Sequence, residues 1–246
     1  MIPFRDNVRC RTTPVVTVSL IIVNSLVFFY ELSLGSETQA FLSRYGVTPS
    51  NLVQWPASGQ SFASVGIPYL TSMFLHGGWF HLIGNMWFLW IFGDNVEDAM
   101  GTARFVAFYL VCGLAAAALQ VAMGPDSIIP MVGASGAIGG VMGAYIVLYP
   151  RVHVHMLVFL GFFITTFAVP AVFMLAYWLL IQLVSGLFSL GAEGGGVAFW
   201  AHVGGFVGGM ALIFMFRNQR LLARHPYHGW RQTSSPTRSW RRIDRR

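Results

Sequence analysis

Apolar residues run in long stretches along this chain, and polar residues gather between the stretches rather than alternating with them. A helix needs about 20 predominantly apolar residues to cross the hydrocarbon core of a bilayer. Stretches near that length predict membrane-spanning helices over 14–34, 79–97, 103–123, 135–149, 170–189 and 199–217. The pattern therefore predicts an all-α polytopic membrane protein whose six-span domain occupies 14–217, between an N-terminal segment 1–13 and a tail 218–246.

Two further stretches are less regular. Residues 35–78 are semi-apolar and contain Trp55-Pro56, Gly66 and Pro68 as breakers, so we expect a loop that folds on or into the membrane surface. Residues 152–168 are apolar and reach the fifth span through Pro170 without a polar break. We expect 152–189 to form one long or kinked segment.

Composition supports a membrane protein. The chain has 246 residues, of which 55% are hydrophobic and 10% charged, whereas soluble domains carry about 25% charged residues. The apolar run from Pro14 to Leu34 is too long for a signal-peptide core and shows no cleavage site, so we expect an uncleaved first span. The net charge of +6 comes from arginines near the chain ends, which does not indicate nucleic-acid binding.

The arginines also predict the orientation. With the N-terminus in the cytoplasm, every arginine except Arg44 lies on the cytoplasmic side, as the positive-inside rule requires. We therefore expect both termini in the cytoplasm, an Arg-rich tail that is disordered, and residence in a bacterial cytoplasmic membrane. The tail arginines serve as a stop signal or contact anionic lipid.

Polar side chains recur at one depth in three spans. Counted from the cytoplasmic end of each span at 1.5 Å per residue, Ser135, His202 and His81 lie at about 20 to 22 Å. These spans run in the same direction, and Asn85 lies one turn deeper than His81 on the same helix face. Ionisable residues inside a span indicate function, so these residues are candidates for one site.

The fourth span is too short to cross a bilayer. It covers only Ser135 to Tyr149, so the segment from Gly133 to Gly136 must enter the membrane as a loop. Irregular backbone at that depth is tolerated inside protein or beside a water-filled cavity. We expect a recessed wet pocket with Ser135 at a helix start, where free N–H groups favour an oxyanion.

Each signal has a simpler explanation when it is taken alone. Ser-Gly pairs occur at Ser58, Ser135 and Ser185, and small residues in spans are usually packing devices. His202 could be a histidine satisfied inside the bundle. The coincidence of Ser135 and His202 at one depth favours a functional site. The remaining histidines outside the spans, which we expect to be solvated, are His153, His155, His225 and His228.

Several motifs together resemble the rhomboid family of intramembrane serine proteases. They are Gly133-x-Ser135-Gly136, Ala201-His202-x-x-Gly205-x-x-x-Gly209, His76-x4-His81-x3-Asn85 and Val96-Glu97. The resemblance implies a six-helix rhomboid bundle and a Ser–His dyad without an acidic third member. It also implies that His81, Asn85 and the Ser135 N–H hold an oxyanion. We expect no metal or cofactor, because no set of side chains has the spacing of metal ligands.

The sequence departs from the family pattern at two places. An aromatic residue often lies four positions after the serine, beneath the histidine, and here that position is Gly139. Another group must then position His202, and Trp200 or a backbone carbonyl is the expected one. The Trp-Arg pair often found early in the first loop is absent, and Ile67-Pro68 stands nearest that place, so the family's membrane contacts of that loop are not carried over to this chain.

Three functions remain open from the sequence. A protease would cut membrane-spanning or juxtamembrane segments of other proteins, because only segments that unwind easily could enter a serine protease site. A catalytically silent rhomboid-like protein would bind membrane clients, although retention of both Ser135 and His202 argues against it. A transporter would use His81, Asn85 and His202 as a polar relay.

Small residues predict how the site is assembled. Ala201, Gly205 and Gly209 recur every four residues on the sixth span, and Ser135, Gly139 and Gly143 do so on the fourth. Helices in lipid associate by close packing through such stripes. We expect these positions, with Gly133 and Gly136, to bring His202 within hydrogen-bond reach of Ser135.

Overall fold

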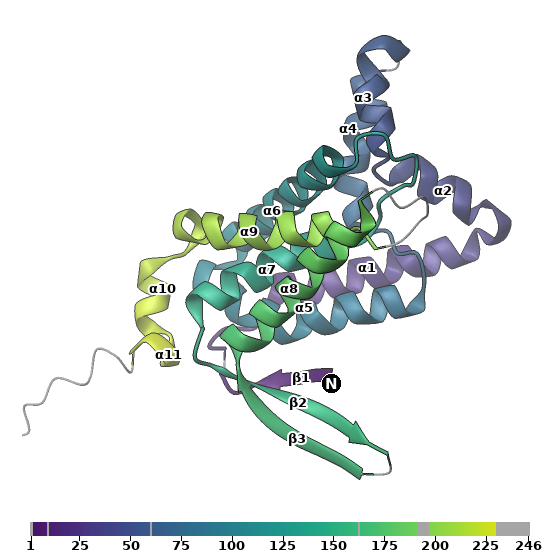
Figure 1. The fold of residues 1–246 in the computed structure, drawn as a ribbon. Helices are drawn as coiled ribbons and strands as arrows, with labels where there is room; N and C mark the ends of the chain where they lie inside the picture. The colour runs from purple at the N-terminus through teal and green to yellow at the C-terminus, as the bar shows by residue number, and fades with distance from the viewer. Residues whose placement is uncertain (1, 9, 60, 162, 191–196, 230–246) are drawn as a thin grey trace, which may run out of the picture.

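The structure is a computed structural model that describes residues 2–8, 10–59, 61–161, 163–190 and 197–229. Within this part of the chain, helices match each predicted span to within three residues at either end (Figure 1). They are α1 (Val15–Ser33), α5 (Trp79–Met100), α6 (Thr102–Met123), α7 (Ser135–Leu148), α8 (Ala171–Ser189) and α9 (Phe199–Phe216). The predicted polytopic helical bundle is confirmed.

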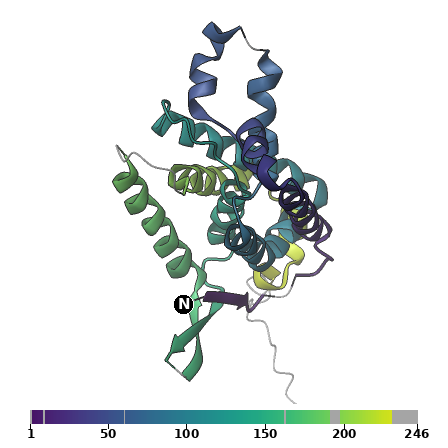
Figure 2. The same cartoon turned by 90° about the vertical axis from the view of Figure 1, so that its right-hand side faces the viewer.

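The short helix α7 is enclosed by its neighbours. Its 14 residues include buried positions on all sides, from Gly136 to Leu148, and it packs against α5, α6 and α9. A helix that is apolar all round is expected in the interior of a bundle. By contrast, α8 lies at the edge, where its buried residues are Ala171, Leu175, Gln182 and Gly186 (Figure 2).

The loop between the first two long helices is itself helical. It contains α2 (Thr38–Tyr45), α3 (Pro49–Ser58) and α4 (Phe62–Thr71), with short 3-10 turns at Gly35–Glu37 and Ser72–Phe74. An isolated β-bridge between Val47 and Met131 ties this loop to the segment that leads into α7. Its expected position at the membrane surface stays a prediction.

The segment before α8 corrects the expectation of a continuous span. Residues 152–170 contain an antiparallel hairpin of β2 (His153–Leu160) and β3 (Phe163–Pro170), and α8 begins only at Ala171. The segment is rich in β-branched and aromatic residues, which favour strands, and Gly161 has the positive φ of 60° that the turn requires. Apolarity alone had suggested a helix.

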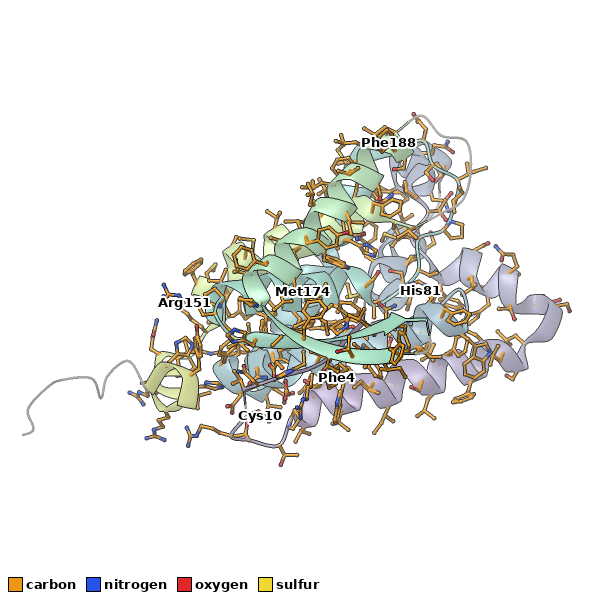
Figure 3. The ribbon with its side chains drawn as sticks, turned by 60° about the horizontal axis from the view of Figure 1, so that its bottom comes forward. Phe4, Cys10, His81, Arg151, Met174 and Phe188 are labelled. Atoms are coloured by element: carbon orange, nitrogen blue, oxygen red, sulfur yellow. The ribbon has the colours of Figure 1, made fainter. Side chains whose placement is uncertain are left out.

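A third strand comes from the N-terminus. Strand β1 (Ile2–Asp6) pairs antiparallel with β2, and Ile2 lies opposite Leu157. The ring of Phe4, labelled beside the sheet in Figure 3, lies 6.0 Å from that of His155. The Asp6 carboxylate accepts hydrogen bonds from the Tyr145 hydroxyl and the Asn95 amide, so the strand is also fixed to the bundle.

The beginning of the C-terminal tail is ordered, contrary to the prediction of disorder from 218 onward. Helices α10 (Gln219–Arg224) and α11 (Pro226–Gly229) follow α9, and the Asn218 side chain caps α10. His225 is only 1% exposed and its Nε2 lies 3.7 Å from Asp98, so the expectation that it is solvated is wrong. Residues 230–246 lie outside the described residues.

Glu97 joins the C-terminal end of α5 to the N-terminal end of α1. Its carboxylate accepts hydrogen bonds from the Val16 N–H at 3.0 Å, the Thr17 N–H at 2.9 Å and the Thr17 hydroxyl at 2.8 Å. Pro14 precedes α1 and supplies no side-chain cap. Glu97 therefore satisfies donors at the start of a helix that has no cap of its own.

We expect Glu97→Ala to destabilise the protein by at least about 3 kcal/mol, because it leaves three buried donors without a partner. Thermal unfolding in detergent measures the loss. Asp126→Ala, at an exposed acidic residue, is the control and should leave the transition unchanged. Equal stability of the two variants would show that Glu97 does not hold α1.

Candidate active site

Ser135 and His202 meet across two helices. Ser135 is the first residue of α7, and His202 lies in the first turn of α9. Their Oγ and Nε2 atoms are 2.8 Å apart, which is a hydrogen bond. Both side chains are partly exposed, so the pair can be reached from outside the protein.

Glycines on α7 and α9 let the two helices approach closely enough for Ser135 and His202 to be in contact. A Cβ atom on Gly205 would lie 1.8 Å from the Gly136 carbonyl oxygen, and one on Gly209 would lie 2.0 Å from the Gly140 carbonyl oxygen. Only a residue without Cβ fits so near to another backbone, so α7 and α9 are in direct backbone contact. The predicted close packing is present, although Gly205 and Gly209 face Gly136 and Gly140 rather than the stripe of Gly139 and Gly143.

Gly133 has a different role from helix packing. It precedes α7 with φ of 126°, and a Cβ there would lie 2.6 Å from His81 Nε2. The positive φ and the close approach of His81 therefore explain why position 133 is a glycine. Ala201 and Gly136 do lie between helices, since a Cβ on Gly136 would be 3.9 Å from that of Ala201.

The group beneath His202 comes from α8, not from α7. A Cβ on Gly139 would already lie 3.0 Å from the His202 carbonyl oxygen, so α9 packs closely against this position. The Trp178 ring lies 5.7 Å from the His202 ring at a tilt of 36°. The His202 Nδ1 atom is 2.7 Å from the Gln182 Oε1 atom.

Trp200 does not position His202, contrary to the sequence-based expectation. It packs instead beside Gly186, whose Cβ would lie 3.1 Å from its ring. Gln182 was missed by the sequence reasoning. The available signal was a carboxamide in the middle of an apolar span, where a polar side chain indicates a specific partner.

Two further donors face the serine. The Gly77 N–H donates to His81 Nδ1 at 3.4 Å, which leaves His81 Nε2 to carry the ring proton toward Gly133 and Ser135. Asn85 is 7% exposed, and among the described residues its Nδ2 group has no hydrogen-bond partner. A buried amide donor without a partner is costly unless something that enters the site accepts from it.

A pocket of about 600 Å³ unites these groups. Its wall includes Ser135, His202, His81 and Asn85, and most of the remaining lining is apolar. The apolar lining comes mainly from α5, from the segment before α7, from α7 and from α8: Phe80, Phe88, Pro130, Met131, Val132, Ile138, Met142 and Trp178. An apolar pocket with a few convergent polar groups is typical of a binding or active site.

His76 packs beside His81, which lines the pocket. It is 2% exposed, and its ring centroid lies 5.2 Å from that of His81. Its backbone N–H donates to the buried carboxylate of Glu31 on α1. Within the described residues, no group of three His, Cys, Asp or Glu side chains is arranged to hold a metal ion.

Comparison with known proteins agrees with this architecture. Residues 63–219, which include α5 to α9, match the family model described as "Rhomboid domain". The chain is 33% identical over 132 residues to "Rhomboid protease GluP" of Bacillus subtilis, covering 53% of this chain and 24% of that protein. It is 32% identical over 163 residues to "RHOMBOID-like protein 7" of Arabidopsis thaliana, covering 66% and 45%.

A third relative is "Rhomboid protease AarA" of Providencia stuartii, which is 28% identical over 144 residues and covers 53% of this chain and 50% of that protein. The chain thus spans half or less of the length of these relatives. Because the family match covers more than half of the chain and includes Ser135 and His202, this integral membrane protein belongs to the rhomboid family.

Proposed function

We propose that the protein is an intramembrane serine endopeptidase. The observation that carries the proposal is the 2.8 Å contact between Ser135 Oγ and His202 Nε2 at the wall of an open pocket. A serine hydroxyl is a weak nucleophile unless a base within hydrogen-bond reach accepts its proton. His202 is that base in the proposed reaction.

The reaction proceeds in two halves. Ser135 Oγ attacks the substrate carbonyl carbon while His202 Nε2 takes the hydroxyl proton, and the carbonyl oxygen becomes an oxyanion. His202 then gives the proton to the leaving amine as the C–N bond breaks, which forms an acyl-enzyme. Water, deprotonated by His202, attacks the ester, and His202 returns the proton to Ser135 Oγ as the ester C–O bond breaks, which releases a carboxylic acid product.

The donors around Ser135 account for oxyanion binding. The His81 Nε2–H, the Asn85 amide and the Ser135 N–H at the start of α7 would donate to the same oxygen. Donors fixed in advance stabilise developing charge without reorganisation during the reaction. The unpartnered Asn85 amide supports this assignment, because the oxyanion would complete its hydrogen bonding.

The substrates we propose are membrane-spanning or juxtamembrane segments that unwind easily. The carbonyls of a regular helix are hydrogen-bonded and enclosed by side chains, so cleavage requires extended backbone. We further propose residence in a bacterial cytoplasmic membrane with both termini in the cytoplasm, as the arginine distribution supports.

The decisive experiment uses the full chain reconstituted in liposomes. A fluorophosphonate should label the protein at one serine, and a model substrate whose transmembrane segment contains Gly and Ala should be cut. Binding of the substrate without labelling or cleavage would favour the silent client-binding alternative. Ion or solute flux without covalent serine chemistry would favour the transporter.

We expect Asn85→Ala to lower kcat by about 10²-fold with little change in KM, because one of several oxyanion donors is lost. Steady-state cleavage of the model substrate measures both constants. Asn24→Ala, which removes another buried asparagine, on α1 and outside the pocket, should leave kcat unchanged. A raised KM with normal kcat would assign Asn85 to substrate binding instead.

A further inference from the structure

Gln182 belongs to a directed chain of hydrogen bonds that ends at Ser135. Its Nε2 group donates to the Trp178 carbonyl at 3.4 Å, and its Oε1 atom lies 2.7 Å from His202 Nδ1. His202 Nε2 in turn lies 2.8 Å from Ser135 Oγ. Gln182 is 7% exposed, so its carboxamide is held in place inside the protein.

The direction of this series of hydrogen bonds determines which ring nitrogen of His202 carries the proton. A carboxamide has a donating end and an accepting end. Because its NH₂ group faces the Trp178 carbonyl, which can only accept, its oxygen faces His202. The Nδ1 atom must then carry the ring proton, and Nε2 keeps a lone pair for the Ser135 hydroxyl.

The opposite orientation of the Gln182 carboxamide would prevent His202 from acting as the base for Ser135. If the NH₂ group faced Nδ1, the proton would move to Nε2, which could no longer accept from Ser135. The carbonyl of Trp178, one turn earlier on α8, prevents this by accepting from the NH₂ group. The accepting oxygen would also stabilise the imidazolium that forms when His202 takes the serine proton.

A neutral amide suits this position. α8 runs from Ala171 to Ser189 and contains no Asp, Glu, Lys or Arg. A carboxylate there has no cationic partner on its own helix and would depend on the His202 imidazolium for compensation, whereas an amide that makes both hydrogen bonds needs no charged partner. Position 139 on α7 is a glycine and offers no side chain that could contact His202 in place of Gln182.

We propose that Gln182 is a positioning residue that selects the Nδ1–H tautomer of His202 and so makes Nε2 available as the base. The proposal deepens the proposed protease function and rests on it. It assigns to α8, a helix at the edge of the bundle, a direct part in the geometry of the Ser135–His202 pair.

The test compares Gln182→Met with Gln182→Glu in the full chain. Methionine has similar size and no strong acceptor, and we expect kcat to fall by roughly 10²-fold or more with KM within about twofold of the parent. Glutamate keeps an acceptor for Nδ1–H and should restore most of the activity. Its negative charge favours the imidazolium, so the acidic limb of kcat/KM should move to higher pH.

Leu180→Met, on the lipid-exposed side of the same helix, is the matched control and should behave like the parent. A spectroscopic readout does not depend on turnover: ¹⁵N-histidine NMR should show His202 protonated at Nδ1 in the parent and not in Gln182→Met. The His202 resonances are identified by their loss in His202→Ala.

Failure of this inference can be told apart from failure of the protease function. If the parent protein is neither labelled by fluorophosphonate nor active, the proposed function fails. If the parent cleaves and Gln182→Met cleaves equally well, or if Gln182→Glu is as inactive as Gln182→Met, only the role of Gln182 is overturned.

Discussion

Ser135→Ala should abolish cleavage and fluorophosphonate labelling while the protein still folds. The hydroxyl is the proposed attacking group, and comparable serine removals lower kcat by roughly 10⁶-fold. The change removes one oxygen atom from a partly exposed side chain, and the backbone of α7 is unaffected. Turnover in liposomes and thermal unfolding, measured on the same preparation, separate lost chemistry from lost fold.

The chain offers a matched control for this variant. Ser185 also precedes a glycine and lies on α8, outside the residues that line the pocket. Ser185→Ala should keep full turnover and labelling. Full activity of Ser135→Ala would eliminate the proposed nucleophile and, with it, the mechanism given above.

Gly205→Ala should remove activity although position 205 carries no reactive group. The added Cβ would lie 1.8 Å from the Gly136 carbonyl oxygen, which is backbone and cannot rotate away. The helices α7 and α9 must therefore separate. A displacement near 1 Å of reacting groups costs about 10²-fold in rate, and the lost contact should also lower the unfolding temperature.

Gly208→Ala is the control on the same helix. Its Cβ would meet the Ala115 side chain at 3.4 Å, an ordinary contact on the face that α9 presents to α6. We expect near-normal turnover and stability for this variant. Normal turnover in Gly205→Ala would show that backbone contact between α7 and α9 does not determine the distance between Ser135 and His202.

The helices, and the common level of Ser135 and His202 in the bundle, were predictable because both follow from span lengths and from the rise per residue. Each span needs a certain apolar length, and the rise per residue gives a depth for Ser135 and His202. Helices that run in the same direction then place the two residues at one level. Their lateral contact depended on a second local signal, the spacing of small residues that lets two backbones approach.

Features that depend on non-local pairing were not predictable in this way. The hairpin of β2 and β3 and the long helices are both apolar, so hydrophobicity alone did not separate strand from helix. The pairing of β1 with β2 joins positions such as Ile2 and Leu157, which no local pattern connects. Gln182 was overlooked because an uncharged amide does not stand out by charge.

The sheet has a consequence for biosynthesis. Strand β1 leaves the ribosome first, but its partner at Leu157 is made 155 residues later. At translation rates of 5 to 20 residues per second, β1 waits roughly 8 to 30 s before its pairing with β2 can form. During that interval the early helices enter the membrane while residues 2–6 stay unpaired, and the sheet closes only after α7 has been inserted.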